Sequence, residues 1–155
     1  MKFLVCFFLF ISYFISNDLI GMGKKKFFST KYNEVNIRNG PGKKYFIIAT
    51  LYQKGIPLKR LSVFDTWIQV EDINGLRGWV SKSQLTEKRH AFVIVKSTHI
   101  NKYPNSKSKK IANIHENVIV EVTKCNKEWC KIKIRNFNGW VYKSYIWGIE
   151  TNEIF

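Results

Sequence analysis

The sequence predicts an all-β protein in which two small barrels follow one another after an N-terminal signal segment. Three observations predict this fold. The chain of 155 residues opens on an apolar run. The remainder consists of short β-branched and aromatic runs separated by turn residues, as in β proteins with short strands. Three motifs of this remainder occur twice in the same order, which indicates a duplicated unit.

The N-terminal segment has the layout of a secretory signal. Lys2 precedes an apolar run over residues 3–15, and polar side chains interrupt the run at residues 16–18. A membrane-spanning helix needs roughly 20 apolar residues, so export fits this run better than a permanent span. We therefore expect residues 1–23 to be a signal peptide and the protein to lie in the periplasm or cell envelope. The alternative is an uncleaved anchor, which would be the protein's contact with the membrane.

Three pairs of motifs define the repeated unit. Trp67 and Trp129 each open an apolar run, 62 residues apart, and Trp79 and Trp140 each follow a glycine, 61 residues apart. Residues 35–41 align with residues 98–104 at an offset of 63. The join falls in a short polar stretch at residues 86–90, with almost no linker. We expect one domain over residues 27–88, called unit 1, and a second over residues 90–149, called unit 2.

Each unit is predicted to be a series of short strands. In unit 1 the strand-forming runs are residues 47–51, 57–63, 67–71 and 76–80, and turn residues separate them. In unit 2 residues 118–122 and 129–134 alternate apolar with polar, the period of a half-buried antiparallel strand. Residues 82–85 and 143–146 can each form one helical turn. Short strands with a single turn in so small a unit predict a closed or nearly closed barrel.

Several of these motifs resemble the bacterial SH3-like (SH3b) family. The opening strand and turn over residues 35–42, Lys54-Gly55 before an apolar strand, Trp67, and Gly78-Trp79-Val80 occur in that family's order and spacing. A signal peptide, two such units and a Cys-x4-Cys hairpin also resemble a small family of proteobacterial periplasmic SH3-like proteins. The resemblance implies two tandem SH3-like β-barrels that bind cell-wall peptidoglycan, typically its peptide part. Unit 2 departs from the pattern, because Asn101 replaces the arginine supplied by Arg38 and residues 103–105 replace the glycine-bearing turn.

The charge of the chain favours anionic partners. Lysine and arginine number 26 against 11 acidic residues, a formal net charge of +15. Lys2 and Asp18 are the only charged residues in residues 1–23 and their charges cancel, so the net charge belongs to the chain that follows the signal segment. Acidic cell-wall polymers, acidic lipid head groups and nucleic acid all fit such a surface, but export removes the opportunity for nucleic-acid binding. The alternative is that the lysines only solvate the surface.

The two cysteines after the signal segment are Cys125 and Cys130, on either side of a predicted hairpin turn. Cysteines so placed face each other on adjacent strands, and a pair in a small exported domain favours a structural disulfide. A metal site needs further ligands, and His90, His99 and His115 show no ligand spacing. A redox pair usually spaces its cysteines by two residues before a helix. We therefore expect a disulfide, no metal and no cofactor.

The aromatic and basic residues near the turns are the candidate binding groove. Trp67 and Trp129, beside a hairpin turn, are expected to be partly exposed, whereas Trp79 and Trp140 are expected to be core anchors. No nucleophile with a neighbouring base is evident, so we expect no catalytic residue. The expected function is an exported, non-catalytic module that binds a cell-wall peptide or glycan, or another envelope component. The alternatives are an envelope protein–protein scaffold that recruits a separate cell-wall enzyme, and an unrecognised cell-wall amidase or peptidase. The groove residues are Lys43, Lys44, Tyr45 and Trp67 in unit 1 and Trp129, Tyr142 and Tyr145 in unit 2.

Overall fold

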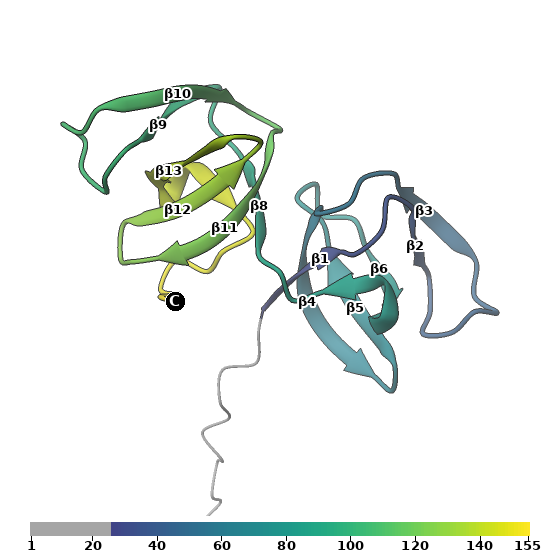
Figure 1. Ribbon diagram of the computed structural model, residues 1–155. Helices are drawn as coiled ribbons and strands as arrows, with labels where there is room; N and C mark the ends of the chain where they lie inside the picture. Colours follow the sequence, from purple (N-terminus) through teal and green to yellow (C-terminus); the bar gives the residue numbers. More distant parts are fainter. Residues whose placement is uncertain (1–25) are drawn as a thin grey trace, which may run out of the picture.

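The computed structural model describes residues 26–155, so the predicted signal segment lies outside the described residues. The described chain forms two antiparallel sheets of seven strands, side by side in Figure 1. The first sheet has the strand order β3-β2-β6-β5-β4-β1-β7. Its elements are β1 (Phe27–Thr30), β2 (Val35–Arg38), β3 (Ile47–Leu51), β4 (Pro57–Phe64), β5 (Trp67–Glu71), β6 (Arg77–Ser81), the 3-10 turn η1 (Lys82–Gln84) and β7 (Leu85–Thr86).

The second sheet repeats the first. Its order, β10-β9-β13-β12-β11-β8-β14, is that of the first sheet with seven added to each strand number. Its elements are β8 (His90–Val93), β9 (Ser97–Asn101), β10 (Lys110–His115), β11 (Ile119–Cys125), β12 (Trp129–Ile134), β13 (Phe137–Tyr142), the 3-10 turn η2 (Lys143–Tyr145) and β14 (Ile146–Trp147). The prediction of an all-β fold in two tandem copies is confirmed. None of the helices in residues 26–155 has the length and apolar character needed to cross a membrane.

Each sheet encloses its own core. Side chains that point inward alternate with side chains that point outward along the strands, so that in several strands every second residue is buried. In β5 the residues Ile68 and Val70 are buried while their neighbours are not. The two cores are separate clusters made mainly of aliphatic side chains. Unit 1 is built on Phe28, Val35, Ile37, Leu58, Ile68, Val70, Val80 and Leu85, and unit 2 on Ala91, Val93, Ile100, Ile114, Val120, Val122, Ile132, Val141, Ile146 and Ile149 with both cysteines.

The prediction that Trp79 and Trp140 are core anchors is wrong, because both are only half-buried. The inward position beside each tryptophan belongs to its glycine. A Cβ on Gly78 would collide with the side chain of Ile37, and a Cβ on Gly139 would lie 2.6 Å from Ile100. Only glycine lets β6 and β13 approach the opening strand so closely, and strand alternation then turns the following tryptophan outward.

The units meet across a packed junction formed by β1, the segment before β8 and the C-terminal residues. The Phe27 and Trp147 rings pack edge to face, with centroids 5.2 Å apart. Arg89 donates from Nη1 to the Phe27 carbonyl at 3.1 Å and pairs with the Glu153 carboxylate, which joins both units through one guanidinium. Lys26 and Glu150 form a second ion pair, at 3.0 Å. In Figure 1, β1 and β8 lie between the two barrels.

His90, the first residue of β8, lies inside this junction against Gly55 of unit 1. Burial lowers the pKa of His90, and its contact with the Lys88 carbonyl and the nearby Glu121 carboxylate oppose the shift only in part. Gly148 passes close by: with φ of 126°, its missing Cβ would lie 2.5 Å from the His90 carbonyl oxygen. The junction therefore has no room for a side chain at position 148. Protonation of His90 would destabilise the folded chain.

Candidate functional site

The hairpin between β11 and β12 positions the first aromatic residue of the site. Asn126 accepts hydrogen bonds through Oδ1 from the backbone N–H groups of Glu128, at 2.9 Å, and Trp129, at 2.7 Å. Such a side-chain turn is a preferred role of asparagine. It fixes the start of β12, so that Trp129 faces Tyr142 across the β12–β13 ladder.

Three of the predicted groove residues form one aromatic cluster in unit 2. Trp129 stacks on Tyr142 with ring centroids 3.9 Å apart, and Tyr142 meets Tyr145 edge to face at 5.3 Å. Tyr142 ends β13 and Tyr145 ends η2, so a strand pair and one helical turn bring the rings together. Tyr142 and Tyr145 are half-buried, but Trp129 is only 5% exposed. The expectation of a partly exposed Trp129 is therefore wrong, because Tyr142 covers its ring.

Two cavities border this cluster. The smaller, about 170 Å³, lies between the three rings and the β9–β10 hairpin. Its other lining residues are polar: Thr98, His99, Asn101, Ser106 and Lys110. It therefore offers ring surface, hydroxyl and amide groups and one ammonium, with no carboxylate. None of these five polar residues was predicted. The signal that could have found them is the repeat offset of 63, by which Asn101 corresponds to Arg38.

The larger cavity, about 680 Å³, lies on the other side of Tyr142. It is bounded by the β11–β12 turn, η2 and the C-terminal segment. Its lining mixes charged and apolar groups: Lys127, Glu128, Tyr142, Lys143, Ser144, Ile146, Trp147, Ile149 and Thr151. Tyr142 is the residue common to both cavities.

Lys143 stands at the base of this region and has a structural role. Its side chain is 6% exposed, and Nζ donates to the backbone carbonyls of Thr151, at 3.3 Å, and Glu153, at 2.7 Å. Burial lowers the pKa of Lys143, and the Glu153 carboxylate opposes that shift. The equivalent residue of unit 1, Lys82, is exposed. Lys143 therefore fastens the C-terminal segment to unit 2 and does not point a free ammonium into the cavity.

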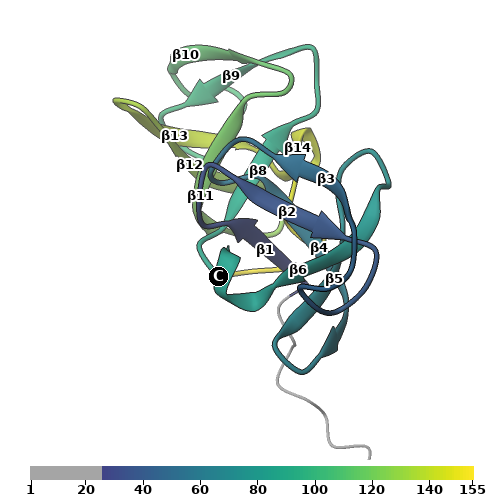
Figure 2. The ribbon, with the colours of Figure 1, turned by 90° about the vertical axis from the view of Figure 1, so that its right-hand side faces the viewer.

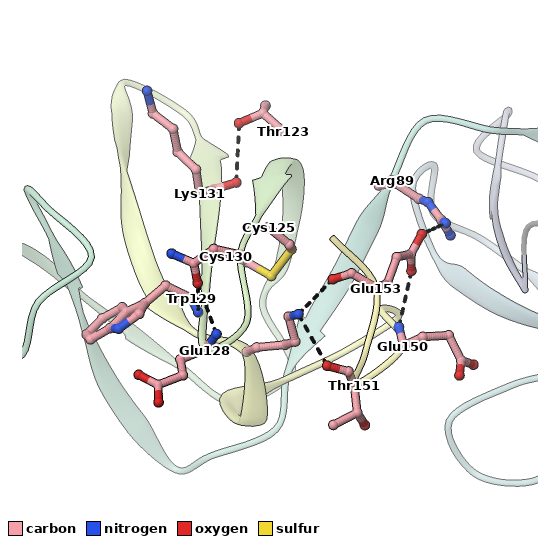
Figure 3. Close-up of a disulfide and its surroundings, with 12 residues drawn as sticks. Arg89, Thr123, Cys125, Glu128, Trp129, Cys130, Lys131, Glu150, Thr151 and Glu153 are labelled. Carbon is pink, nitrogen blue, oxygen red and sulfur yellow. Dashed lines mark hydrogen bonds and ion pairs between the residues drawn. A yellow bond between two sulfur atoms is a disulfide. The ribbon is translucent and has the colours of Figure 1, made fainter. Parts of the chain in front are cut away.

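The disulfide joins β11 to β12 next to Trp129 (Figure 3). Cys125 and Cys130 are cross-strand partners with Cα atoms 4.1 Å apart, and their sulfurs are bonded, as the cysteine spacing predicts. Figure 3 shows Trp129 directed away from the sulfurs, and Glu153 directed toward Arg89. The two cysteines therefore form a structural crosslink and carry no free thiol. Among residues 26–155 no group of three or more His, Cys, Asp or Glu side chains could hold a metal ion.

The four groove residues predicted in unit 1 do not form an equivalent cluster. Tyr45 packs its ring against Gly40 in the β2–β3 turn, and Arg38 donates to the Tyr45 carbonyl at 2.7 Å. Lys44 lies over the Tyr45 ring at 5.8 Å, and Lys43 is exposed. Trp67 is cross-strand from Ser81, not from a tyrosine. Within the described residues no ring contact joins Tyr45 to Trp67.

Two substitutions between the units explain why unit 1 lacks the aromatic cluster. The residues of unit 1 that correspond to Trp129, Tyr142 and Tyr145 are Trp67, Ser81 and Gln84. Ser81 and Gln84 are polar and have no aromatic ring, so at these equivalent positions the aromatic cluster occurs in unit 2 alone. We therefore take the cluster and its two cavities as the candidate binding site.

Comparison with known proteins found a curated relative and similar solved structures. A curated relative, the putative N-acetylmuramoyl-L-alanine amidase YrvJ of Bacillus subtilis (strain 168), is 26% identical over 125 residues, covering 74% of this chain and 24% of that protein. The chain thus spans about a quarter of that relative. The solved structures of NlpC2 and NlpC1 from Trichomonas vaginalis have TM-scores of 0.37 and 0.36 at 16% and 15% identity, covering 80% and 79% of this chain and 48% and 45% of theirs.

The match to a family model identifies the family of both units. The family described as bacterial SH3 domain matches residues 31–87 and residues 98–148, one match in each sheet. Together these ranges cover more than half of the chain, and the chain therefore belongs to the bacterial SH3 domain family.

Proposed function

We propose that the chain is a non-catalytic binding module of the bacterial cell envelope and that unit 2 holds peptidoglycan through its peptide part. The observation that carries the proposal is the cluster of Trp129, Tyr142 and Tyr145 with a cavity on each side. Ring faces and phenol groups bind amphipathic ligands, because they supply apolar area and a polar edge together.

The smaller cavity has the chemistry that a peptide with free carboxylates requires. Lys110 supplies an ammonium and takes part in none of the ion pairs formed within residues 26–155. The Thr98 and Ser106 hydroxyls and the Asn101 amide can exchange hydrogen bonds with peptide groups. Without a carboxylate in its lining, the cavity does not repel an anionic ligand.

Three further observations support the proposal, the first two an envelope role and the third the absence of a cysteine nucleophile. The family is that of bacterial SH3 domains, and a relative is named as a putative N-acetylmuramoyl-L-alanine amidase. The apolar run at residues 3–15 favours export. The disulfide removes Cys125 and Cys130 as thiolate nucleophiles.

Retention on purified sacculi at about 0.15 M salt tests the proposal, since screening at that ionic strength weakens loose charge pairing. We expect the full chain to be retained and Y142A/Y145A to be retained about tenfold less, as the loss of aromatic anchors usually costs. The matched control is Y45A, which removes a tyrosine of unit 1. Thermal melts of all three proteins separate loss of binding from loss of folding.

Three results would contradict the proposal. Equal retention of the two variants would show that the aromatic cluster is not the site. No retention of the folded full chain would favour the envelope scaffold instead. A cleared band on a sacculus zymogram would show that the module is catalytic.

A further inference from the structure

The outer strand of the first sheet, β3 with the residues that flank it, is a surface that the proposed function does not use. Among the strands of residues 26–155, β3 pairs only with β2 and forms the edge of its sheet. Figure 1 shows β3 on the side of unit 1 away from unit 2, and Figure 2 shows β2 and β3 uncovered on the face turned toward the viewer. An uncovered edge presents backbone N–H and C=O groups to any extended chain that approaches it.

The side chains along this edge are unusually apolar for an uncovered strand. Phe46 is 80% exposed, Ile47 49%, Ile48 45% and Tyr52 76%. Natural edge strands are usually protected by charged residues, particularly lysine. No charged side chain lies between Tyr45 and Gln53.

Unit 2 carries that protection at the equivalent positions. The strand registers of β2–β3 and β9–β10 superimpose at an offset of 63, because Val35 pairs with Leu51 as Thr98 pairs with Ile114. At that offset Phe46 and Ile47 correspond to Lys109 and Lys110, and Tyr52 corresponds to His115. The fold therefore does not need apolar residues at these positions. Folding alone therefore does not explain why unit 1 has exposed apolar residues where unit 2 has lysines, and binding of another molecule at β3 would explain it.

The charge around the β3 edge indicates the kind of occupant. Lys43 and Lys44 precede the strand and Lys54 follows it, and none of the three takes part in an ion pair within the described residues. No acidic residue occurs from Val35 to Phe64. A partner that pairs with the strand between these lysines is favoured when its own residues are acidic. A second copy of this chain would place lysines opposite lysines.

We propose that β3 is a docking edge for an extended, acidic segment of a partner protein, which adds to the first sheet as an eighth strand. Backbone hydrogen bonds to β3 supply the pairing, apolar side chains of the segment pack on Phe46, Ile47 and Tyr52, and its carboxylates face the flanking lysines. The proposal rests on unit 1 and is independent of the peptidoglycan site in unit 2.

The test uses the full chain and a short capped peptide in which glutamate alternates with valine. Titration followed by NMR reports the affinity, the amide shifts of β3 and their hydrogen exchange. We expect shifts and slowed exchange at β3, and no binding of the matched peptide in which lysine alternates with valine.

The variant F46K/I47K installs the residues that unit 2 carries. We expect it to bind the glutamate–valine peptide about tenfold more weakly, the usual cost of losing apolar anchors. Two added positive charges would instead tighten binding that depends on charge alone. L61K/V63K makes the same charge change on exposed residues outside β3, and we expect it to bind at least as tightly as the unaltered chain.

Several outcomes would overturn the proposal. Unchanged or tighter binding by folded F46K/I47K would show that β3 is not the site, and so would equal binding of the lysine–valine peptide. Self-association in analytical ultracentrifugation that F46K/I47K abolishes would make the occupant a second copy. Shifts of the β3 amides with phosphatidylglycerol vesicles but not with the peptide would make it a membrane surface.

Discussion

Reduction of the Cys125–Cys130 disulfide is predicted to destabilise unit 2 measurably. The bridge closes a loop with a sequence separation of 5 residues across the β11–β12 hairpin. It also fixes the strand end to which the C-terminal segment pairs. The Cys125 N–H donates to the Phe155 carbonyl at 2.8 Å, and the Phe155 N–H donates to the Cys125 carbonyl at 3.2 Å. This segment explains why Cys125 is 1% exposed while Val63, its equivalent in unit 1, is 55% exposed.

The size of the effect follows from loop closure. A crosslink over so short a loop restricts the unfolded chain by about 2 kcal/mol in the chain-entropy model. That free energy lowers the Tm by about 8–16 °C for a domain the size of one unit, but by about 4–8 °C for a cooperative body the size of both. The junction of Arg89, Phe27 and Trp147 favours the second value, because it makes the units unfold together.

Thermal melts of the oxidised and reduced chain, followed by circular dichroism, measure this shift. The control is C125A/C130A, which should melt at the same temperature with and without reductant. It also reports any effect of the remaining cysteine, Cys6. A shift below about 2 °C in the unaltered chain would refute the reasoning, as would an equal shift in the control.

Three further predictions concern the junction and the C-terminal segment. K143M should lower the free energy of unfolding in urea by about 1–3 kcal/mol, because the C-terminal segment loses the buried donor that holds two of its backbone carbonyls, whereas K82M at the exposed equivalent should change it by less than about 0.5 kcal/mol. Because the pKa of His90 is lowered in the folded state, stability should be full above pH 6.5 and fall as the pH drops below it, and H90Q should flatten this part of a Tm-against-pH curve. G148A should lower the Tm, because a side chain at φ of 126° is strained and meets the His90 carbonyl; an unchanged Tm would show that the junction yields freely.

Much of the fold is predictable from the sequence, because the core positions carry a periodic signal. The strands predicted at residues 47–51, 67–71 and 129–134 have the observed bounds, and both helical turns occur within the predicted residues. The short strands β7 and β14 have two residues each and are too short for any periodicity. The sequence did not predict β1, because all four of its residues are buried, the polar Ser29 and Thr30 included. Its sequence therefore lacks the alternation of apolar and polar residues that indicates a half-buried strand.

The site was less predictable, because it depends on which residues meet across strands. The sequence indicated Trp129, Tyr142 and Tyr145 as candidates, and the register explains their contact: Trp129 is paired with Tyr142. It did not indicate that this pairing buries Trp129, nor that Lys143 turns toward the backbone of the C-terminal segment. Both outcomes depend on segments distant in sequence, which no local pattern reports.

The two units show how one fold can carry two surfaces. Equivalent inward positions keep their character, as Ile37 and Ile100 do beside Gly78 and Gly139, because the close strand approach leaves no room for change. Equivalent outward positions do not, and Phe46 corresponds to Lys109. Since such positions contribute little to folding, a duplicated unit is free to lose one surface and acquire another.

The junction gives this divergence a consequence for function. Arg89 bonds to unit 1 and to the C-terminal segment of unit 2, and Gly148 leaves little space between them. These contacts restrict the motion of one unit against the other, so that a partner docked on unit 1 and a ligand held by unit 2 would lie within a limited range of distances. Such a restriction raises the effective concentration of one bound molecule near the other only when both can be engaged at once. On our two proposals, the junction is what would turn two binding surfaces into an adaptor between a protein and the cell wall.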